Sequence, residues 1–259
     1  MPKLFQIKSR PFKFSFILII LFSLNLLMSS CSSITKDESD STSGMTAEEI
    51  YNEAQDSMEG GNYDQAVELF EKLDVKFPYG PYAKQAKLEI IYAYFKYDNL
   101  ESAIIAAERF IKLFPTDPHV DYAYYMQGVS RYEVEESFLD SWFDQDPTER
   151  DPESARDSFK YFGLLLKNYP NSIYNEDAKK RMLFIRNSLA KHEIHVANYY
   201  FKRRAYVAAV NRSKYVLKNY QKTPSVKDAL QIMVNAYKKL NLIKLADDAQ
   251  RVLNKNYPG

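Results

Sequence analysis

Aromatic residues followed by proline recur along the chain, and each pair closes an amphipathic segment. The pairs are Phe77-Pro78, Phe114-Pro115, Tyr169-Pro170 and Tyr257-Pro258, with Tyr220-Gln221 as a fifth member that lacks the proline. A small residue stands twelve positions before each proline position. These small residues are Ala66, Ala103, Ser158, Ala209 and Ala246. An internal repeat of this kind constrains the architecture more than any local motif does.

Larger apolar residues follow each small residue at helical spacing, as Phe70 and Leu73 do after Ala66. They share one helix face at i, i+4 and i+7. The small residue allows a second helix to approach closely, and the proline ends the unit because it cannot continue a helix. The pattern resembles the tetratricopeptide repeat, a helix hairpin. We therefore predict an all-α tetratricopeptide-repeat solenoid of about five helix hairpins.

The closing positions are 37, 55, 51 and 37 residues apart, against about 34 for a simple unit. Units three and four must therefore carry insertions or longer helices. We expect repeats one to three over residues 46–170 and repeats four and five over residues 171–259.

The extra segment of the third unit, residues 133–153, holds nine acids against one base, and it contains Trp142, the only tryptophan. Its aromatic residues have two interpretations. They fold back onto the solenoid, or they form a partner-binding loop, since exposed aromatic residues within a polar rim mark interfaces. Trp142 is thus a candidate partner-binding residue.

The first thirty residues have the parts of a secretory signal. A basic stretch comes first, an apolar run from Phe14 to Met28 follows, and two serines precede Cys31. The run is shorter than the roughly twenty apolar residues that span a bilayer. Residues 1–30 are therefore predicted to be a signal peptide and not a permanent membrane helix.

Leu27-Met28-Ser29-Ser30-Cys31 resembles the lipobox of bacterial lipoproteins, although Met28 stands where leucine is usual. Cys31 is the only cysteine, so it can form no intramolecular disulfide. We predict that it is lipidated, and the alternative is an ordinary cleavage site with an incidental cysteine. Two or more acyl chains give stable anchoring. Residues 31–45 are then the lipidated cysteine and a tether of small and polar residues that cannot form a core.

Cleavage after residue 30 removes four of the 35 basic residues and none of the 34 acidic ones, which leaves a net charge of −3. This balance argues against nucleic-acid binding, which relies on basic side chains. His192 and His195 share a predicted helix face beside Glu193, but their spacing is not the His-Glu-x-x-His of a zinc site. We predict neither a metal nor another cofactor.

An enzyme has little support in the sequence, since no nucleophile elbow or phosphate-binding glycine loop is present. The enzymatic alternative is a helical-solenoid lytic enzyme of the cell wall, which needs an additional catalytic domain. The repeats and their insertions already use every stretch from Thr46 to Pro258, so no room remains for that domain. We therefore predict that the protein is not an enzyme.

In a tetratricopeptide solenoid the first helix of each hairpin lines the groove. Projecting the repeat register onto the first three units gives a set of predominantly aromatic residues for that groove. They are Tyr51, Gln55, Tyr92, Phe95, Lys96, Tyr125, Val129 and Tyr132. Such a groove suits an extended or unfolded peptide, which it would bind by stacking and main-chain hydrogen bonds. The alternative for each residue is core packing between repeats.

The fourth unit carries three adjacent basic residues, Lys202, Arg203 and Arg204, in its turn. They have three interpretations: a solvated turn, contact with membrane lipid, or pairing with carboxylates of a partner, for which arginine is the better bidentate donor.

Residues 46–258 as a whole resemble the lipoprotein family of the outer-membrane β-barrel assembly machinery. The stretches that carry this resemblance are Phe77-Pro78-Tyr79-Gly80-Pro81-Tyr82, Ile91 to Lys96, Arg109 to Leu113, Asp121-Tyr122, Asp151-Pro152, Tyr169 to Ser172 and Val196 to Tyr200. The resemblance implies a non-enzymatic scaffold, lipid-anchored on the periplasmic face of the outer membrane.

The implied partners are the barrel insertase, other assembly lipoproteins and unfolded outer-membrane protein precursors. The carboxyl-terminal repeats would bind periplasmic domains of the insertase, with Arg203 at the contact, and the amino-terminal repeats would receive precursors. The alternative is a repeat-containing lipoprotein adaptor for cell-wall synthesis or polysaccharide export, and co-purification distinguishes the two.

Overall fold

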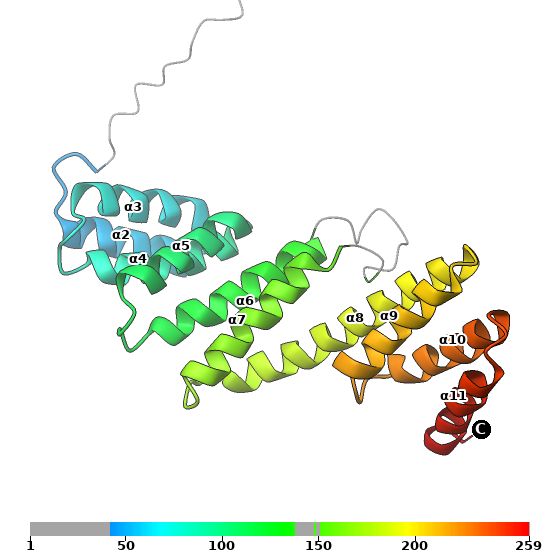
Figure 1. Ribbon diagram of the computed structural model, residues 1–259. Coiled ribbons are helices and arrows are strands. Elements are labelled where there is room, and N and C mark those ends of the chain that lie inside the picture. The colour runs from blue at the N-terminus through cyan, green and yellow to red at the C-terminus, as the bar shows by residue number, and fades with distance from the viewer. Residues whose placement is uncertain (1–41, 138–147, 149–150, 259) are drawn as a thin grey trace, which may run out of the picture. The chain divides into compact units, whose positions relative to one another are not determined.

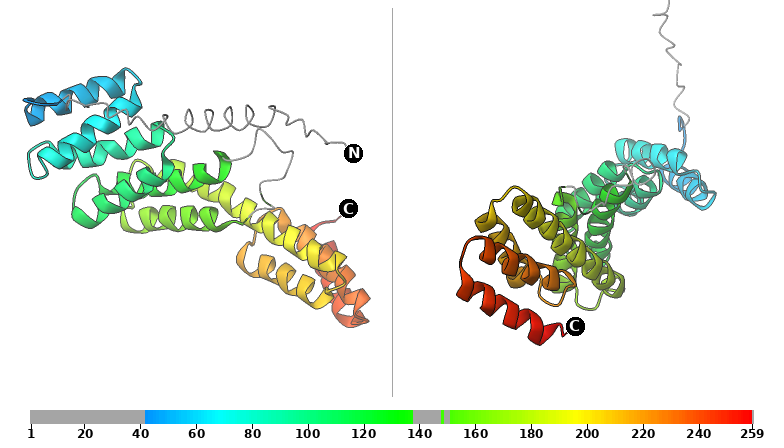
Figure 2. Two further views of the ribbon diagram at one scale, coloured as in Figure 1. Left: turned by 90° about the horizontal axis from the view of Figure 1, so that it is seen from above. Right: turned by 90° about the vertical axis from the view of Figure 1, so that its right-hand side faces the viewer.

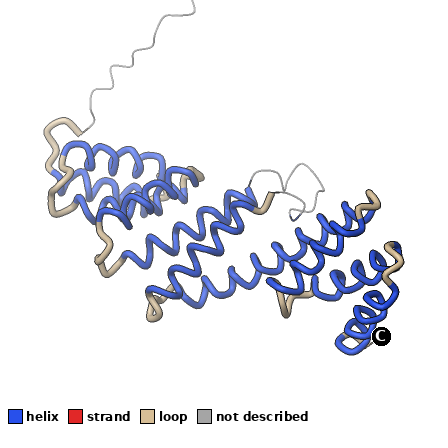
Figure 3. The backbone as a smooth tube through the Cα atoms, in the orientation of Figure 1, coloured by secondary structure: helices blue, strands red, loops and turns tan. Residues whose placement is uncertain are grey.

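The computed structural model describes residues 42–137, 148 and 151–258, and in this part of the chain it contains ten α-helices and no strand (Figures 1 and 3). The helices are α2 (Ala47–Glu59), α3 (Tyr63–Lys76), α4 (Ala83–Lys96), α5 (Leu100–Leu113), α6 (Val120–Ser137), α7 (Glu153–Asn168), α8 (Asn175–Lys202), α9 (Tyr206–Asn219), α10 (Ser225–Lys239) and α11 (Ile243–Asn256). The all-α class is confirmed.

Consecutive helices pair as hairpins, α2 with α3 through to α10 with α11, and each hairpin packs against the next. The views of Figures 1 and 2 show this succession along the chain. The first helices also meet directly, α4 with α6 and α8 with α10. The described residues thus form five helix hairpins in a tetratricopeptide-type stack, as predicted.

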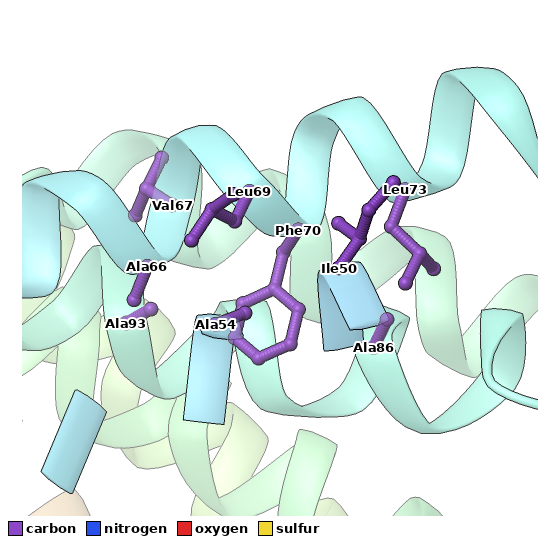
Figure 4. Close-up of a cluster of buried hydrophobic side chains, with 9 residues drawn as sticks. All are labelled: Ile50, Ala54, Ala66, Val67, Leu69, Phe70, Leu73, Ala86 and Ala93. Atoms are coloured by element: carbon purple, nitrogen blue, oxygen red, sulfur yellow. The ribbon is translucent and has the colours of Figure 1, made fainter. Parts of the chain in front are cut away.

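The repeat register defines the core of every second helix. The five small residues predicted to allow close helix approach are each at most 1% exposed. In the first hairpin, Ala66, Phe70 and Leu73 of α3 pack against Ile50 of α2 and Ala86 of α4 (Figure 4). Burial of such side chains contributes roughly 1.5–3 kcal/mol for each large one. The small and apolar residues that recur at fixed spacing in the sequence are therefore the ones that pack between helices.

An aromatic residue caps the carboxyl end of each second helix, and the cap has one geometry throughout. Its φ lies between −122° and −136°, and its amide N–H donates to the carbonyl four residues back. A following proline disfavours helical backbone at that position. Tyr220 takes the same conformation, with φ of −122°, although Gln221 follows it. The missing proline therefore does not change where α9 ends.

Tight turns join the two helices of hairpins one, two, four and five, and each has one residue in the left-handed region. The residues are Gly61, Asp98, Arg204 and Asn241, with φ between 59° and 76°. The amide that follows each of them donates to a carbonyl five residues back, as in Asn62 to Ser57. This bonding satisfies carbonyls at the helix end.

The long units have different physical origins. Helix α8 runs for 28 residues, against 13 to 15 for α2, α4 and α10. Of the two predicted alternatives, a longer helix therefore accounts for the fourth unit. In the third unit, most of residues 138–150, including Trp142, lie outside the described residues, as do Cys31 and Met28. None of the helices in the described part is both long and apolar enough to cross a membrane.

Candidate functional site: a tyrosine-rich face on the first helices

Six tyrosines gather on the first helices of hairpins one to four, and we call them the tyrosine face. They are Tyr51, Tyr82, Tyr92, Tyr122, Tyr125 and Tyr174. Three ring pairs join neighbouring helices across this face. The Tyr51 and Tyr82 centroids are 5.1 Å apart, those of Tyr122 and Tyr174 are 5.6 Å apart, and Tyr125 stacks on Tyr174 at 4.8 Å. Contacts of this geometry stabilise aromatic pairs beyond the area they bury.

The amino-terminal half of the face is centred on the carboxylate of Glu89 in α4. It accepts hydrogen bonds from the Tyr51 hydroxyl at 3.0 Å, from the Gln85 amide at 2.7 Å and from the Gln55 amide. Because Tyr51 and Gln55 belong to α2, Glu89 ties the first helices of hairpins one and two together.

A second carboxylate, Asp177 of α8, has the corresponding role further along. The Tyr125 hydroxyl donates to it at 2.8 Å and the Arg181 guanidinium at 2.6 Å. Arg181 also lies over the Tyr132 ring, 5.8 Å from its centroid. Unlike Glu89, Asp177 therefore has a cationic partner.

The hydroxyls of Tyr51 and Tyr125 are neutral hydrogen-bond donors. Burial and the Glu89 carboxylate raise the pKa of Tyr51 to about 12. Burial and the Asp177 carboxylate raise the pKa of Tyr125 to about 12. Burial raises the pKa of Tyr122 as well. The face consequently offers aromatic surface and fixed polar groups, but it holds no arrangement of nucleophile and base.

Three of the predicted groove residues, Tyr51, Gln55 and Tyr125, belong to the hydrogen-bonded centres of the face. Tyr92 is 39% exposed. Its ring and that of Tyr63 pack in a T-shaped arrangement, with their centroids 6.2 Å apart.

Lys96 is exposed and lies over the Tyr63 ring at 5.6 Å. Tyr132 is half-buried. Its ring and that of Phe184 pack in a T-shaped arrangement, with their centroids 6.0 Å apart.

One predicted groove residue is corrected by the structure. Val129 is 4% exposed and belongs to the core between hairpins three and four. It points between repeats because successive hairpins must bury an apolar seam, and this requirement takes precedence over groove lining. Phe95 is half-buried and packs on the cores of hairpins two and three, as Tyr125 does, so its place in the groove stays a prediction.

Sequence reasoning missed Tyr82, Glu89, Tyr122, Tyr174 and Asp177. One signal was available, because Tyr82, Gln85, Glu89 and Tyr92 follow one another at intervals of three, four and three residues. Those intervals place them on a single helix face. The contacts of Tyr174 and Asp177 with α6 depend on packing between hairpins and have no local pattern.

The predicted partner-binding residues of the fourth hairpin lie at its tip. Lys202 ends α8, Arg203 is its C-cap and Arg204 follows in the turn, and all three are exposed. The Arg203 guanidinium lies over the Tyr199 ring, 5.0 Å from its centroid. None of the three forms an ion pair within the described residues.

The histidine pair considered as a metal site lies on α8. His192 approaches the carbonyl oxygen of Thr148 at 2.9 Å through its Nδ1. The neighbouring Glu193 carboxylate is bound by Arg156 and Arg212. Across the described residues no group of three or more histidine, cysteine or acidic side chains is arranged to hold a metal ion.

Comparison with known proteins identifies the family. Residues 43–252 match the YfiO family, described as outer membrane lipoprotein. The chain is 40% identical to the outer membrane protein assembly factor BamD of Neisseria gonorrhoeae over 243 residues, which cover 93% of this chain and 91% of that protein. It is 36% identical to BamD of Vibrio cholerae over 208 residues, covering 80% and 86% of the two chains.

Among solved structures, a tetratricopeptide repeat protein from Parabacteroides merdae aligns with 82% of this chain and 67% of its own, with 12% identity and a TM-score of 0.37. The family match and the identity to the BamD proteins extend over nearly all of the five hairpins. The chain therefore belongs to the YfiO family of outer membrane lipoproteins, whose match runs from Ser43 to Val252, within α11.

Proposed function

We propose that this protein is a non-enzymatic, lipid-anchored scaffold of outer-membrane protein assembly, which holds unfolded β-barrel precursors and a barrel insertase close together. The role in assembly follows from membership of the family and from high identity to BamD proteins, which are named outer membrane protein assembly factors. The observation that carries the scaffold role is the tyrosine face, a binding surface without catalytic groups.

Precursor binding is supported by the chemistry of the face. An unfolded barrel strand presents alternating apolar side chains and unpaired main-chain amides. Half-buried tyrosine rings offer stacking surface at little cost in side-chain entropy. The carboxylates of Glu89 and Asp177 and the amides around Glu89 are fixed polar groups that fit main-chain donors and acceptors. We therefore place the precursor on hairpins one to three.

Insertase binding is supported by the basic turn of the fourth hairpin. Arg204 has φ of 61°, whereas the equivalent turn positions hold Gly61, Asp98 and Asn241, residue types that tolerate left-handed backbone. An arginine in this conformation is strained, and such strain concentrates at functional positions. We propose that Lys202, Arg203 and Arg204 bind acidic groups on periplasmic domains of the insertase.

Anchoring through Cys31 completes the proposal. An acylated Cys31 at the outer membrane, followed by the tether of residues 32–44, keeps the hairpins next to their partners. Holding two partners on one tethered chain raises their effective concentration without any new contact. Mass spectrometry of the mature protein tests this part, and an unmodified Cys31 would remove the anchor from the account.

An affinity pull-down through the mature protein tests the function as a whole. We expect to recover a barrel insertase and unfolded outer-membrane proteins. Recovery of cell-wall synthases or polysaccharide exporters without an insertase would favour the adaptor alternative.

A charge reversal tests the insertase contact. Arg203→Glu should weaken insertase binding by about tenfold or more, because it replaces an attractive charge by a repulsive one. Helix content by circular dichroism should not change, since Arg203 is an exposed C-cap. Lys167→Glu, at an exposed position of α7 in hairpin three, is the control. Unchanged binding by the Arg203 variant would remove that residue from the interface.

A further inference from the structure

We propose that the Glu89 centre of the tyrosine face is a recognition site for a lysine or arginine side chain of the bound polypeptide. This inference rests on the proposed binding of precursors and adds a charge preference to it. The partner's cationic group would lie against the Glu89 carboxylate and the surrounding tyrosine rings.

Among the described residues, the Glu89 carboxylate has hydrogen-bond donors but no counter-ion. Its three partners there, Tyr51, Gln55 and Gln85, are all neutral. An ionised carboxylate accepts about four hydrogen bonds, so one acceptor position remains. Two of the three bonds go to Oε1 and one to Oε2. The remaining position is therefore on Oε2.

The basic residues of the surrounding helices are engaged elsewhere. Helix α2 contains no lysine or arginine. On α4, Lys84 pairs with Asp117 at 2.7 Å, and Lys87 pairs with Asp74. On α6, Arg131 lies over the Tyr161 ring and bonds to Gln127.

Lys96, at the end of α4, lies over Tyr63. The chain therefore supplies no cation to Glu89 within the described residues.

Tyrosine rings surround this uncompensated charge. Tyr51 donates to Glu89 and its ring lies beside Tyr82. Burial is the main cause of the raised pKa of Tyr122, and the Glu89 carboxylate adds to it. A ring face attracts a cation, and more strongly when the pair is desolvated. Aromatic rings and a carboxylate together form a site that binds a cation in preference to a neutral or anionic group.

A neighbouring acid extends the negative charge beyond Glu89. Glu48 of α2 faces the Tyr82 hydroxyl, where it contributes to a raised tyrosine pKa after burial. The other carboxylate on the face, Asp177, is compensated by Arg181. The preference for a cation is thus specific to the amino-terminal half of the face, which α2 and α4 form.

Binding of designed peptides to the full mature lipoprotein in detergent tests the proposal. The probes are three fluorescein-labelled peptides of about ten residues with the alternating pattern of a barrel strand, identical except for a central Lys, Gln or Glu. Fluorescence anisotropy should give an affinity about tenfold higher for the Lys peptide than for the Gln peptide, as for one charge-assisted contact. The Glu peptide should bind most weakly, and salt should reduce the differences.

Variants of Glu89 test whether the preference for the Lys peptide arises at this site. Glu89→Gln removes the charge but keeps the shape of the side chain, so it should make the affinities for the Lys and Gln peptides equal. Glu89→Lys should invert the order in favour of the Glu peptide. Glu68→Gln, on the exposed side of α3 where it pairs with Lys72, should bind as the native protein does. Melting curves of all variants check the fold.

The outcomes distinguish failure of the cation site from failure of precursor binding. Equal binding of the three peptides to the native protein, or a Lys preference that survives Glu89→Gln, would overturn the cation site and leave precursor binding standing. Absence of binding by all three would overturn the cation site together with the precursor-binding function on which it rests.

Discussion

Gly128 shows how closely the hairpins pack at the scale of a single residue. A Cβ built at this position would lie 2.5 Å from the ring of Phe162, which is fully buried. We expect Gly128→Ala to lower the free energy of unfolding by about 1–3 kcal/mol, because the ring has no space into which it can move. Urea denaturation followed by circular dichroism measures the change.

Gly163 of α7 is the matched control. No atom lies within 4 Å of a Cβ at this position. Gly163→Ala should therefore stabilise the protein by about 0.5–1 kcal/mol, through helix propensity alone. Equal effects of the two alanines would contradict the packing described here.

A second prediction at the scale of a single residue concerns Arg204. Because its backbone is left-handed, Arg204→Gly should raise the free energy of unfolding by about 1 kcal/mol. The same change should weaken insertase binding, since it removes a positive charge from the basic turn. Thermal melting and a binding assay on one preparation test both statements. A variant with more stability and full binding would show that the arginine has no role in the contact.

Residues of the repeat were more predictable than residues of the site. Ala66 and Phe70 could be placed in the core because local helix periodicity fixes which face is buried. Val129 was placed wrongly in the groove, since its burial depends on the seam between hairpins three and four. Glu89 was not predicted at all, because its importance arises from donors on α2 that lie more than thirty residues away in sequence.

Helix α8 is the element that joins hairpins three and four. Its Glu193 is 3% exposed and is bound by Arg156 of α7 at 3.8 Å and by Arg212 of α9 at 3.2 Å. Both arginine side chains are about half exposed. A buried carboxylate thus fixes the position of three helices. The spacing of the repeats predicted a long fourth unit but could not distinguish a longer helix from an inserted loop, since both lengthen the interval equally.

This arrangement predicts non-additive substitutions. Arg156→Ala or Arg212→Ala alone should cost less than about 1 kcal/mol, since the remaining arginine still compensates Glu193. The double variant should cost about 3 kcal/mol or more, because it leaves a buried charge unpaired. A double-mutant cycle measured by urea denaturation gives the coupling. Arg251→Ala, which breaks an exposed pair with Asp248, is the control, and simple additivity would contradict a shared role.

Across the whole molecule the proposed functions lie on different hairpins. The tyrosine face belongs mainly to hairpins one to three, and the basic turn closes the first helix of hairpin four. Five hairpins packed in sequence can hold two partners on one chain, which is the physical requirement for a scaffold. The sequence predicted the hairpins and placed a candidate groove on their first helices, whereas the tyrosine face could be defined only from the contacts between helices.

A photo-crosslinking amino acid placed at Tyr92 in cells tests the central claim most directly. Tyr92 is 39% exposed beside the Glu89 centre, whereas Ile105 of α5 is 66% exposed on a second helix and serves as the matched control. We predict that the Tyr92 position captures unfolded outer-membrane precursors and that the Ile105 position does not. Absence of precursors at Tyr92, or equal capture at both positions, would contradict the assignment of the tyrosine face as the precursor-binding surface.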